Sequence, residues 1–485
     1  MAVLDTQIVA SSLPDIAASL GATVEEASWI QTAYMIAEVI MIPLAGWLSR
    51  ALSLRRLYSL ACAIFTLSSL LCALSWSLES IIVIRILQGL CSGILAPLLY
   101  QGIYLMFPRE RQSGVTLYVV LVVSFAPIIG PTLGGWITQN WSWRWLFLIN
   151  LLPGVMVSTS VFVLMKREEI DTSRLKQLDV TGVLLAAFFL GSLEYVLGKG
   201  PDNDWFDSRL IATFAVVAAV SFLLLVWREL TCQHPVIDLR TFRDRNFSTG
   251  CLFNFVMGVG LFGSGYLMVL FLSAVKGYNS QQIGEVMAVP GAAMLLTLPL
   301  LRIIRRYLDG RICLAIGLSL FAWALWLNAG LTASIGFEDL FWPQVLRGTA
   351  IMMCLSPVTE LALGRLPLTA IPNATGLYSL MRSLGGGIGI AVINYLVVQR
   401  SGFHYWRLAE RLNPDRYLEY METLQAPFAE RLTDLEQAGQ GGIRLITRLV
   451  RRESLLMAYN DAWFLVAALF VVMMFLVPMV RRVNR

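Results

Sequence analysis

The sequence predicts an all-α polytopic membrane protein, and three observations carry that prediction. First, 57% of the 485 residues are hydrophobic and only 14% are charged, whereas soluble domains carry about 25% charged residues. Second, the mean hydropathy is +0.68, which leaves too little polar surface for a water-soluble globule. Third, the apolar residues fall into runs of about 20, the length that crosses a bilayer as a helix. The composition excludes a cytosolic enzyme, a secreted disulfide scaffold and a disordered chain.

Fourteen apolar runs are predicted to cross the membrane, each bounded by charges, by glycine and proline clusters or by an interfacial tryptophan. They lie at 1–20, 28–48, 57–76, 79–106, 113–138, 144–165, 178–198, 209–227, 249–275, 281–303, 311–331, 338–363, 372–400 and 462–480. Only Met1 to Leu4 precede Asp5 in the first run, and about 6 Å of helix cannot reach from there to the membrane surface. We therefore expect the first span to be truncated.

The positive charges predict the orientation of the chain. Loops after even-numbered spans, together with the C-terminal tail, hold 21 arginines and lysines, whereas the short loops after odd-numbered spans hold 4. The positive-inside rule then places both termini in the cytoplasm. The long segment 401–461 lies outside, and its apolar residues recur at helical spacing between charges. That pattern predicts two or three amphipathic helices, on the membrane surface, on the rest of the chain or on a partner.

A weak internal repeat predicts two similar halves. The segment Arg85–Ile–Leu–Gln88–Gly89 in the fourth span resembles Gln344–Val–Leu–Arg347–Gly348 in the twelfth, 259 residues later. The basic segment 46–55 is matched by 302–311, 256 residues later. Nearly equal offsets favour two parallel six-helix repeats. We expect a six-helix bundle at 1–165, an inserted helix pair with linkers at 166–248, and a second bundle at 249–485 that includes the loop 401–461.

Charged side chains inside the predicted spans are the first candidates for function, because each costs about 2.5–3.5 kcal/mol at the bilayer centre. They are Asp5, Glu38, Arg85, Glu194, Glu285, Arg347, Glu360 and Arg382. Burial raises the pKa of a carboxyl group and a neighbouring arginine lowers it, so such a group can bind and release a proton near neutral pH. We predict a proton relay of Asp5 and Glu38, with Arg85 as the modulating charge. The alternative is a structural ion pair between helices.

The fifth predicted span contains a Gly-Pro-x-x-Gly-Gly motif made by Gly130, Pro131, Gly134 and Gly135. Gly130 and Gly134 share one helical face and permit close approach of a second helix. Pro131 removes a backbone donor and is expected to bend the helix. A single Gly-x-x-x-Gly pair would be a generic packing motif, but the extended form is more specific.

No resident cofactor or metal is expected. The two histidines, His234 and His404, are far apart in the sequence, so a histidine-based metal site is not predicted. The sequence has no Gly-x-x-x-x-Gly-Lys-Ser/Thr loop for ATP. It also has no recognisable nucleophile–base pair, so we do not expect an enzyme.

Several motifs, taken together, resemble the major facilitator drug:proton antiporters. They are Leu4–Asp5…Leu13–Pro14, Pro43–Leu44–Ala45–Gly46–Trp47, Arg85–Ile–Leu–Gln88–Gly89, Gly130–Pro131–Thr–Leu–Gly134–Gly135 and Trp143–Arg144–Trp145–Leu–Phe147–Leu–Ile149–Asn150. The fourteen predicted spans narrow the resemblance to the fourteen-helix branch. Asp204–Trp205–Phe206, Trp227–Arg228–Glu229–Leu230, Phe242–Arg–Asp–Arg245–Asn246–Phe247, Trp342–Pro343–Gln344 and the long outer loop are similar to the EmrB type.

The resemblance implies a major facilitator fold and proton-driven export of hydrophobic or amphipathic drugs across the bacterial inner membrane, without a cofactor. It links Asp5 and Arg85 to proton coupling, and the fifth-span motif to antiport. It implies a gating loop that includes Gly46, Arg50 and Arg55. Expected partners are small-molecule substrates, protons and the lipid bilayer, with a periplasmic adaptor and an outer-membrane channel that the 401–461 loop would meet. No nucleic acid is expected.

The chain departs from the family pattern at several positions. Arg50 stands where an acidic residue is usual and Ser53 where glycine is usual, which puts the salt bridge of the gating loop in doubt. Ala10 replaces an asparagine. Glu38, Glu194 and Arg347 stand where amides are expected. Extra acids are consistent with cationic substrates, with an altered proton stoichiometry or with structural pairing.

A drug cavity needs apolar and aromatic walls with a few polar groups. The side chains predicted to face it are Gln31, Tyr34, Gln88, Asn254, Tyr378 and Arg382. Ordinary helix packing is the alternative for each of them. Two other functions stay open: a dedicated exporter of one endogenous metabolite, such as a siderophore or toxin, and a non-transporting receptor or scaffold on the same fold.

Overall fold

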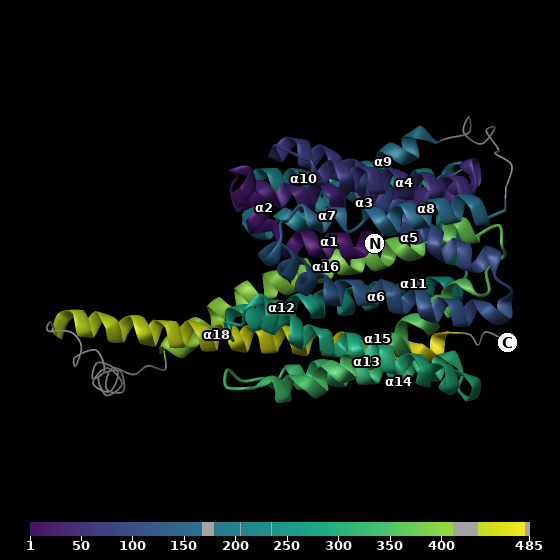
Figure 1. Ribbon diagram of the computed structural model, residues 1–485. Helices are drawn as coiled ribbons and strands as arrows, with labels where there is room; N and C mark the ends of the chain where they lie inside the picture. The colour runs from purple at the N-terminus through teal and green to yellow at the C-terminus, as the bar shows by residue number, and fades with distance from the viewer. Residues whose placement is uncertain (167–178, 204, 234, 411–434, 481–485) are drawn as a thin grey trace.

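The computed structural model describes residues 1–166, 179–203, 205–233, 235–410 and 435–480. Over these ranges the chain forms helices and short helical turns and contains no β-strand. The α-helices are α1 (Ala2–Ser11), α2 (Leu13–Leu20), α3 (Val24–Leu52), α4 (Leu54–Ala73), α5 (Leu78–Met106), α6 (Arg109–Asn140), α7 (Trp145–Leu148), α8 (Leu151–Leu164), α9 (Val180–Lys199), α10 (Arg209–Thr231), α11 (Arg245–Gly258), α12 (Ser264–Ala274), α13 (Ser280–Tyr307), α14 (Gly310–Asn328), α15 (Phe337–Leu363), α16 (Ile371–Glu410) and α18 (Leu435–Met474). Most of them run side by side along one direction (Figure 1).

Thirteen of the fourteen predicted spans have a counterpart among the described helices. Twelve segments are long and apolar enough to cross a membrane, with α7–α8 and α11–α12 each counted as one span. The thirteenth is α6, which bends by 47° between Arg109–Ala126 and Ile129–Asn140. This bend lies just before Pro131, where the missing backbone donor weakens the helix.

The first predicted span, 1–20, is not one continuous helix. It forms α1 and α2, and Ser12 leaves helical geometry between them. Pro14 stands in the first turn of α2. This position tolerates proline because a backbone N–H group there would have no helical partner. The first predicted span is therefore a pair of short helices.

Helix packing and helix starts follow the predicted internal repeat. Within the N-terminal half α3 packs on α5 and α4 on α8, and in the C-terminal half α13 packs on α15 and α14 on α18. The helix of the second predicted span in each half begins with a capping box, Thr23 with Glu26 in α3 and Asn279 with Gln282 in α13. The two boxes are 256 residues apart, the offset of the basic segments. The halves meet where α6 contacts α13 and where α3 and α5 contact α16.

The helices α9 and α10 pack on each other, and α9 also contacts α3 and α16. They occupy the region predicted as an inserted pair. Residues 167–178, next to the first expected domain boundary, lie outside the described residues. The domain boundaries at 165 and 248 stay predictions.

The segment 401–461 was expected as a long loop with separate amphipathic helices, and over its described parts this expectation is wrong. Instead, α16 continues to Glu410 and α18 already begins at Leu435. The two helices pack on each other and extend beyond the rest of the bundle at one end (Figure 1). Arg400 donates from Nε to Oδ2 of Asp461 at 2.6 Å, and Nε2 of His404 lies 2.8 Å from the same oxygen. These polar contacts hold the pair together where the apolar residues end. Residues 411–434 lie outside the described residues.

Candidate functional site

Asp5 and Arg85, predicted from their charge alone, form a buried ion pair in the N-terminal half. Nη1 of Arg85 lies 2.5 Å from Oδ2 of Asp5, and the two residues are 0% and 1% exposed. Asn150 donates from Nδ2 to the other carboxylate oxygen at 2.6 Å. The pair joins α1 to α5, and Asn150, at the start of α8, completes it. Asn150 ends the tryptophan-containing motif noted above, so that motif was the sequence signal for it.

A second layer of polar groups surrounds Arg85. Its Nη1 donates to Oε1 of Gln88 at 2.7 Å, and Gln88 donates from Nε2 to Oγ of Ser69 at 2.7 Å. The guanidinium lies 4.0 Å from the centre of the Tyr34 ring, close enough for a cation–π interaction. Gln88 and Tyr34 were expected to face a drug cavity, but both are fully buried around Arg85. We call Asp5, Ser69, Arg85, Gln88 and Asn150 the N-half polar cluster.

Glu38 lies on the same α3–α5 interface, farther along both helices. It accepts a hydrogen bond from Oγ of Ser92 at 2.8 Å. Glu38 is one helical turn from Tyr34, and Ser92 is two turns from Arg85, so all four share facing sides of α3 and α5. The described contacts include no direct hydrogen bond from Glu38 to Asp5 or Arg85. A relay between the two carboxyl groups would have to pass the Tyr34 ring.

The Gly-Pro-x-x-Gly-Gly motif brings α1 into place. A Cβ atom on Gly130 would overlap Cβ of Gln7, and one on Gly134 would overlap Oγ of Ser11 and lie 2.6 Å from the backbone oxygen of Ile8. These two positions therefore need glycine for α1 and α6 to approach so closely. Pro131 and Gly135 are half-buried in the same part of α6. The motif thus positions α1, the helix that carries Asp5.

The predicted gating residues lie at the end of α3 and the start of α4. A Cβ atom on Gly46 would overlap the backbone oxygen of Pro372 in α16, so the two halves touch there. Arg55 donates from Nε to the backbone oxygen of Phe162 at 2.7 Å. Arg50 is half-buried in the last turn of α3. Within this loop, Gly46 makes contact with the other half, whereas Arg55 connects α4 to α8.

Replacing Ser53 with glycine is expected to stabilise the protein by about 1 kcal/mol. Ser53 has φ +69° and ψ 148°, a region that glycine enters freely and that strains other residues. The substitution loses the weak cap that Ser53 Oγ gives the backbone N–H of Arg56 at 3.4 Å, which costs a few tenths of a kcal/mol. Thermal unfolding in detergent measures the gain. Ser49→Gly is the matched control: it removes a buried helical serine bonded to Gln101, so it should lower Tm.

A second buried arginine lies where the two halves meet. Arg382, on α16, donates from Nε to Oδ1 of Asn254 at 3.1 Å, and Asn254 donates to the backbone oxygen of Tyr378 at 2.6 Å. The guanidinium lies 5.4 Å from the centre of the Tyr100 ring on α5 and 5.6 Å from that of Tyr378. The structure thus brings together three of the predicted cavity residues and adds Tyr100. Gln31 stays apart and lies beside Met35.

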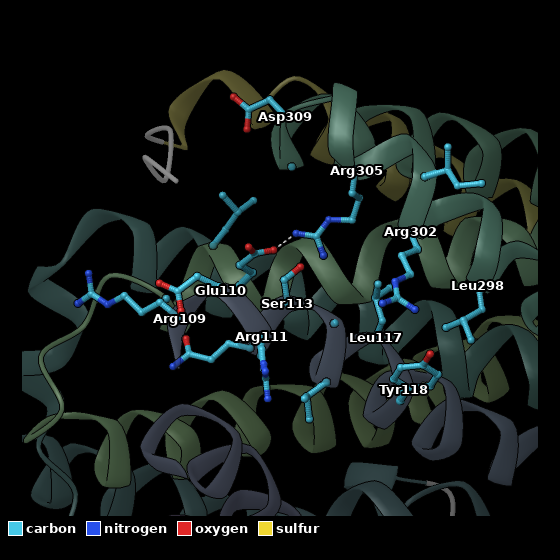
Figure 2. Close-up of a pocket in the computed structure, with 18 of the residues that line it drawn as sticks. Arg109, Glu110, Arg111, Ser113, Leu117, Tyr118, Leu298, Arg302, Arg305 and Asp309 are labelled. Atoms are coloured by element: carbon cyan, nitrogen blue, oxygen red, sulfur yellow. Dashed lines mark ion pairs between the residues drawn. The ribbon is translucent and has the colours of Figure 1, made fainter. Parts of the chain in front are cut away.

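A cleft of about 1420 Å³ opens between the first turns of α6 and the last turns of α13 (Figure 2). Its charged lining residues are Arg109, Glu110, Arg111, Arg302, Arg305, Asp309 and Glu360. Arg305 forms an ion pair with Glu360, shown by the dashed line in Figure 2. Leu117, Leu298 and Leu361 add apolar wall. The volume is ample for an amphipathic ligand, but none of the six predicted cavity residues lines the cleft.

Two helical halves, buried charges within them and a cleft between them define a polytopic membrane transporter. Residues 1–390 match the family description Major Facilitator Superfamily. The chain is 36% identical over 478 residues to the Colistin resistance protein EmrB of Acinetobacter baumannii, covering 98% of this chain and 93% of that one. It is 30% identical over 478 residues to the Multidrug export protein EmrB of Escherichia coli, covering 98% and 92%. The crystal structure of the human organic anion transporter MFSD10 has the same fold, with a TM-score of 0.60, 13% identity and 98% and 96% coverage. The chain belongs to the Major Facilitator Superfamily.

Proposed function

We propose that this chain exports hydrophobic or amphipathic compounds from the cytoplasm across the bacterial inner membrane in exchange for protons. The relatives named for multidrug export and colistin resistance align over nearly the whole chain, which supports drug export. The single observation that carries proton exchange is the fully buried pair of Asp5 and Arg85 with Asn150 on its other side. We propose that the proton gradient alone drives transport, without a cofactor.

The proposed coupling step is the protonation of Asp5. Ionised Asp5 neutralises Arg85, whereas protonated Asp5 leaves the arginine charge uncompensated away from water, which is costly. The chain would then favour a conformation in which Arg85 is better solvated or paired. Because α1 touches α5 through Asp5 and touches α6 through Gly134, loosening the ion pair loosens α6. Since α6 contacts α13 across the halves, the change reaches the interface that must open and close.

The proposed substrate path begins at the cleft between α6 and α13 and leads to the group formed by Tyr100, Asn254, Tyr378 and Arg382. The cleft offers arginines beside leucines, which suits amphipathic molecules. The second group offers aromatic faces, an amide and a guanidinium where α5 meets α16. Such a mixture of apolar walls and few polar groups is typical of small-molecule sites.

We also propose an orientation with both termini in the cytoplasm and the α16–α18 extension in the periplasm. The distribution of arginine and lysine favours this orientation. The extension, joined by Arg400, His404 and Asp461, would then offer a surface for a periplasmic adaptor that leads to an outer-membrane channel.

Substrate-induced proton release in energised everted vesicles tests the proposed function. We expect several cationic, neutral and weakly acidic dyes to cause release in vesicles that contain the chain, and none in vesicles without it. Release with one compound class alone would indicate a dedicated exporter. Folded protein that gives no release with any dye, although a positive-control antiporter does, would refute drug:proton antiport.

A further inference from the structure

The C-terminal half contains a buried arginine without an acidic partner. Arg347, on α15, is 2% exposed. Its Nη1 donates at 3.4 Å to the backbone oxygen of Ser264, and its Nη2 lies 3.9 Å from the sulfur of Met287. Within the described part of the chain no carboxylate pairs with Arg347. The one acidic residue of α13, Glu285, is exposed and accepts a hydrogen bond from Gln281.

Other buried polar side chains in the C-terminal half lack partners as well. Oγ of Ser264, both amide atoms of Gln344 and both amide atoms of Asn328 are buried without a hydrogen bond, and all three residues are at most 1% exposed. Gln344 precedes Arg347 by one helical turn, and Ser264 touches it. A buried polar group without a partner costs free energy, so the hydroxyl and the amide next to a lone cation indicate a missing ligand.

The internal repeat places Asn328 in the same group. The offset of 259 relates Arg85 to Gln344 and Gln88 to Arg347, so arginine and glutamine have exchanged places between the halves. The offset of 256 relates Cys72 to Asn328. In the N-terminal half Cys72 lies against Gln88, with 4.0 Å from Sγ to Oε1. Asn328 is therefore expected to lie against Arg347. We call Ser264, Asn328, Gln344 and Arg347 the C-half polar cluster.

The two clusters differ in one decisive respect. In the N-half polar cluster, a carboxylate from α1 neutralises the arginine. In the C-half polar cluster, helix α12 contributes Ser264, a neutral hydrogen-bond donor. The amides of Gln344 and Asn328 add further N–H donors. A guanidinium, a hydroxyl and two amides, with no negative charge among them, form a site that is complementary to a small anion.

We propose that the C-half polar cluster binds a monovalent anion, either a halide ion or the carboxylate group of a bound organic acid. The anion supplies the countercharge that Asp5 supplies in the other half. It accepts hydrogen bonds from Arg347, Ser264 and the two amides. This inference does not depend on the proposed function, because it concerns the stability of the folded chain.

Thermal unfolding of the purified full chain in detergent tests the proposal. Tm is measured in sulfate, whose anion is divalent and carries no carboxylate, and then with chloride, acetate or octanoate added at constant ionic strength. We expect a saturable rise in Tm of a few degrees with at least one of these anions. Chloride alone would identify an inorganic ion as the ligand, and octanoate alone would identify the carboxylate of an amphipathic acid. A Tm that is the same in all four media would overturn the proposal.

Two variants separate the site from a general salt effect. In Arg347→Gln the rise should disappear. In sulfate this variant should be at least as stable as the parent, because it removes an unpaired buried charge. Arg452→Gln is the matched control: among the described residues, Arg452 donates hydrogen bonds to the backbone oxygens of Val275 and Ala333 and none to the C-half polar cluster, so the rise should remain. An equal rise in the parent and in Arg347→Gln would contradict the site.

Discussion

Replacing Asp5 with asparagine is expected to abolish substrate-induced proton release and to destabilise the folded chain by about 3–5 kcal/mol. The substitution keeps the size of the side chain and its hydrogen bond with Asn150, but it leaves Arg85 as an uncompensated charge in a fully buried position. Proton release in everted vesicles and thermal unfolding in detergent measure the two effects separately.

The double variant Asp5→Asn with Arg85→Gln distinguishes the loss of coupling from the loss of folding. Removing both charges eliminates the buried lone cation, so most of the stability should return. Proton release should stay absent, because no group remains at this position to carry the proton. If the double variant regained proton release, Asp5 would not be the proton carrier. Loss in Glu38→Gln alone would instead move the coupling site to the contact with Ser92.

The pairing of Asp5 with Arg85 could be predicted from the sequence because the bilayer makes unpaired charges costly. Each group therefore needed a partner of opposite sign, and the chain offers few. The same reasoning fails for Arg347, which has no acidic partner among the described residues. The missing acidic partner of Arg347 is a feature of its three-dimensional neighbours and cannot be predicted from the sequence.

The direction in which the neutral polar side chains point could not be predicted in the same way. Gln88 and Asn254 both lie in helices that are apolar on nearly every side, so hydrophobic periodicity does not show which side faces a cavity. The structure turns Gln88 toward Arg85 and Ser69, whereas Asn254 turns toward Arg382. Such choices depend on which helices are neighbours, and that is tertiary information.

Helix ends were the other feature that the sequence predicted poorly. A span was expected to end where apolar residues give way to charges, near Arg400 and Asp461. Both residues lie instead within long helices, and they bind each other. An ion pair between two extended helices looks, in the sequence, like two unrelated loop charges.

Alanine at Gly130 or Gly134 is expected to reduce proton release about tenfold or more, although neither residue is charged. Overpacking of a close contact costs about 1–3 kcal/mol, and here the displaced element is α1, which holds Asp5 beside Arg85. The matched control is Gly198→Ala in α9, since a Cβ atom there meets nothing within 4 Å. Proton release and Tm of Gly198→Ala should stay close to those of the parent.

Second-site changes in α1 should rescue one of these variants and not the other. The Cβ atom of alanine at 130 would collide with Cβ of Gln7, whereas the backbone C and Cα atoms of Gln7 lie 3.5 Å away. Gln7→Gly should therefore restore much of the proton release of Gly130→Ala. The Cβ atom at 134 meets Oγ of Ser11 and also the backbone of Ile8, at 2.6 Å to its oxygen and 3.1 Å to its Cα. Ser11→Gly removes only the first obstacle, so the proton release of Gly134→Ala should stay reduced. Equal rescue of both variants, or of neither, would show that α1 does not rest on this face of α6.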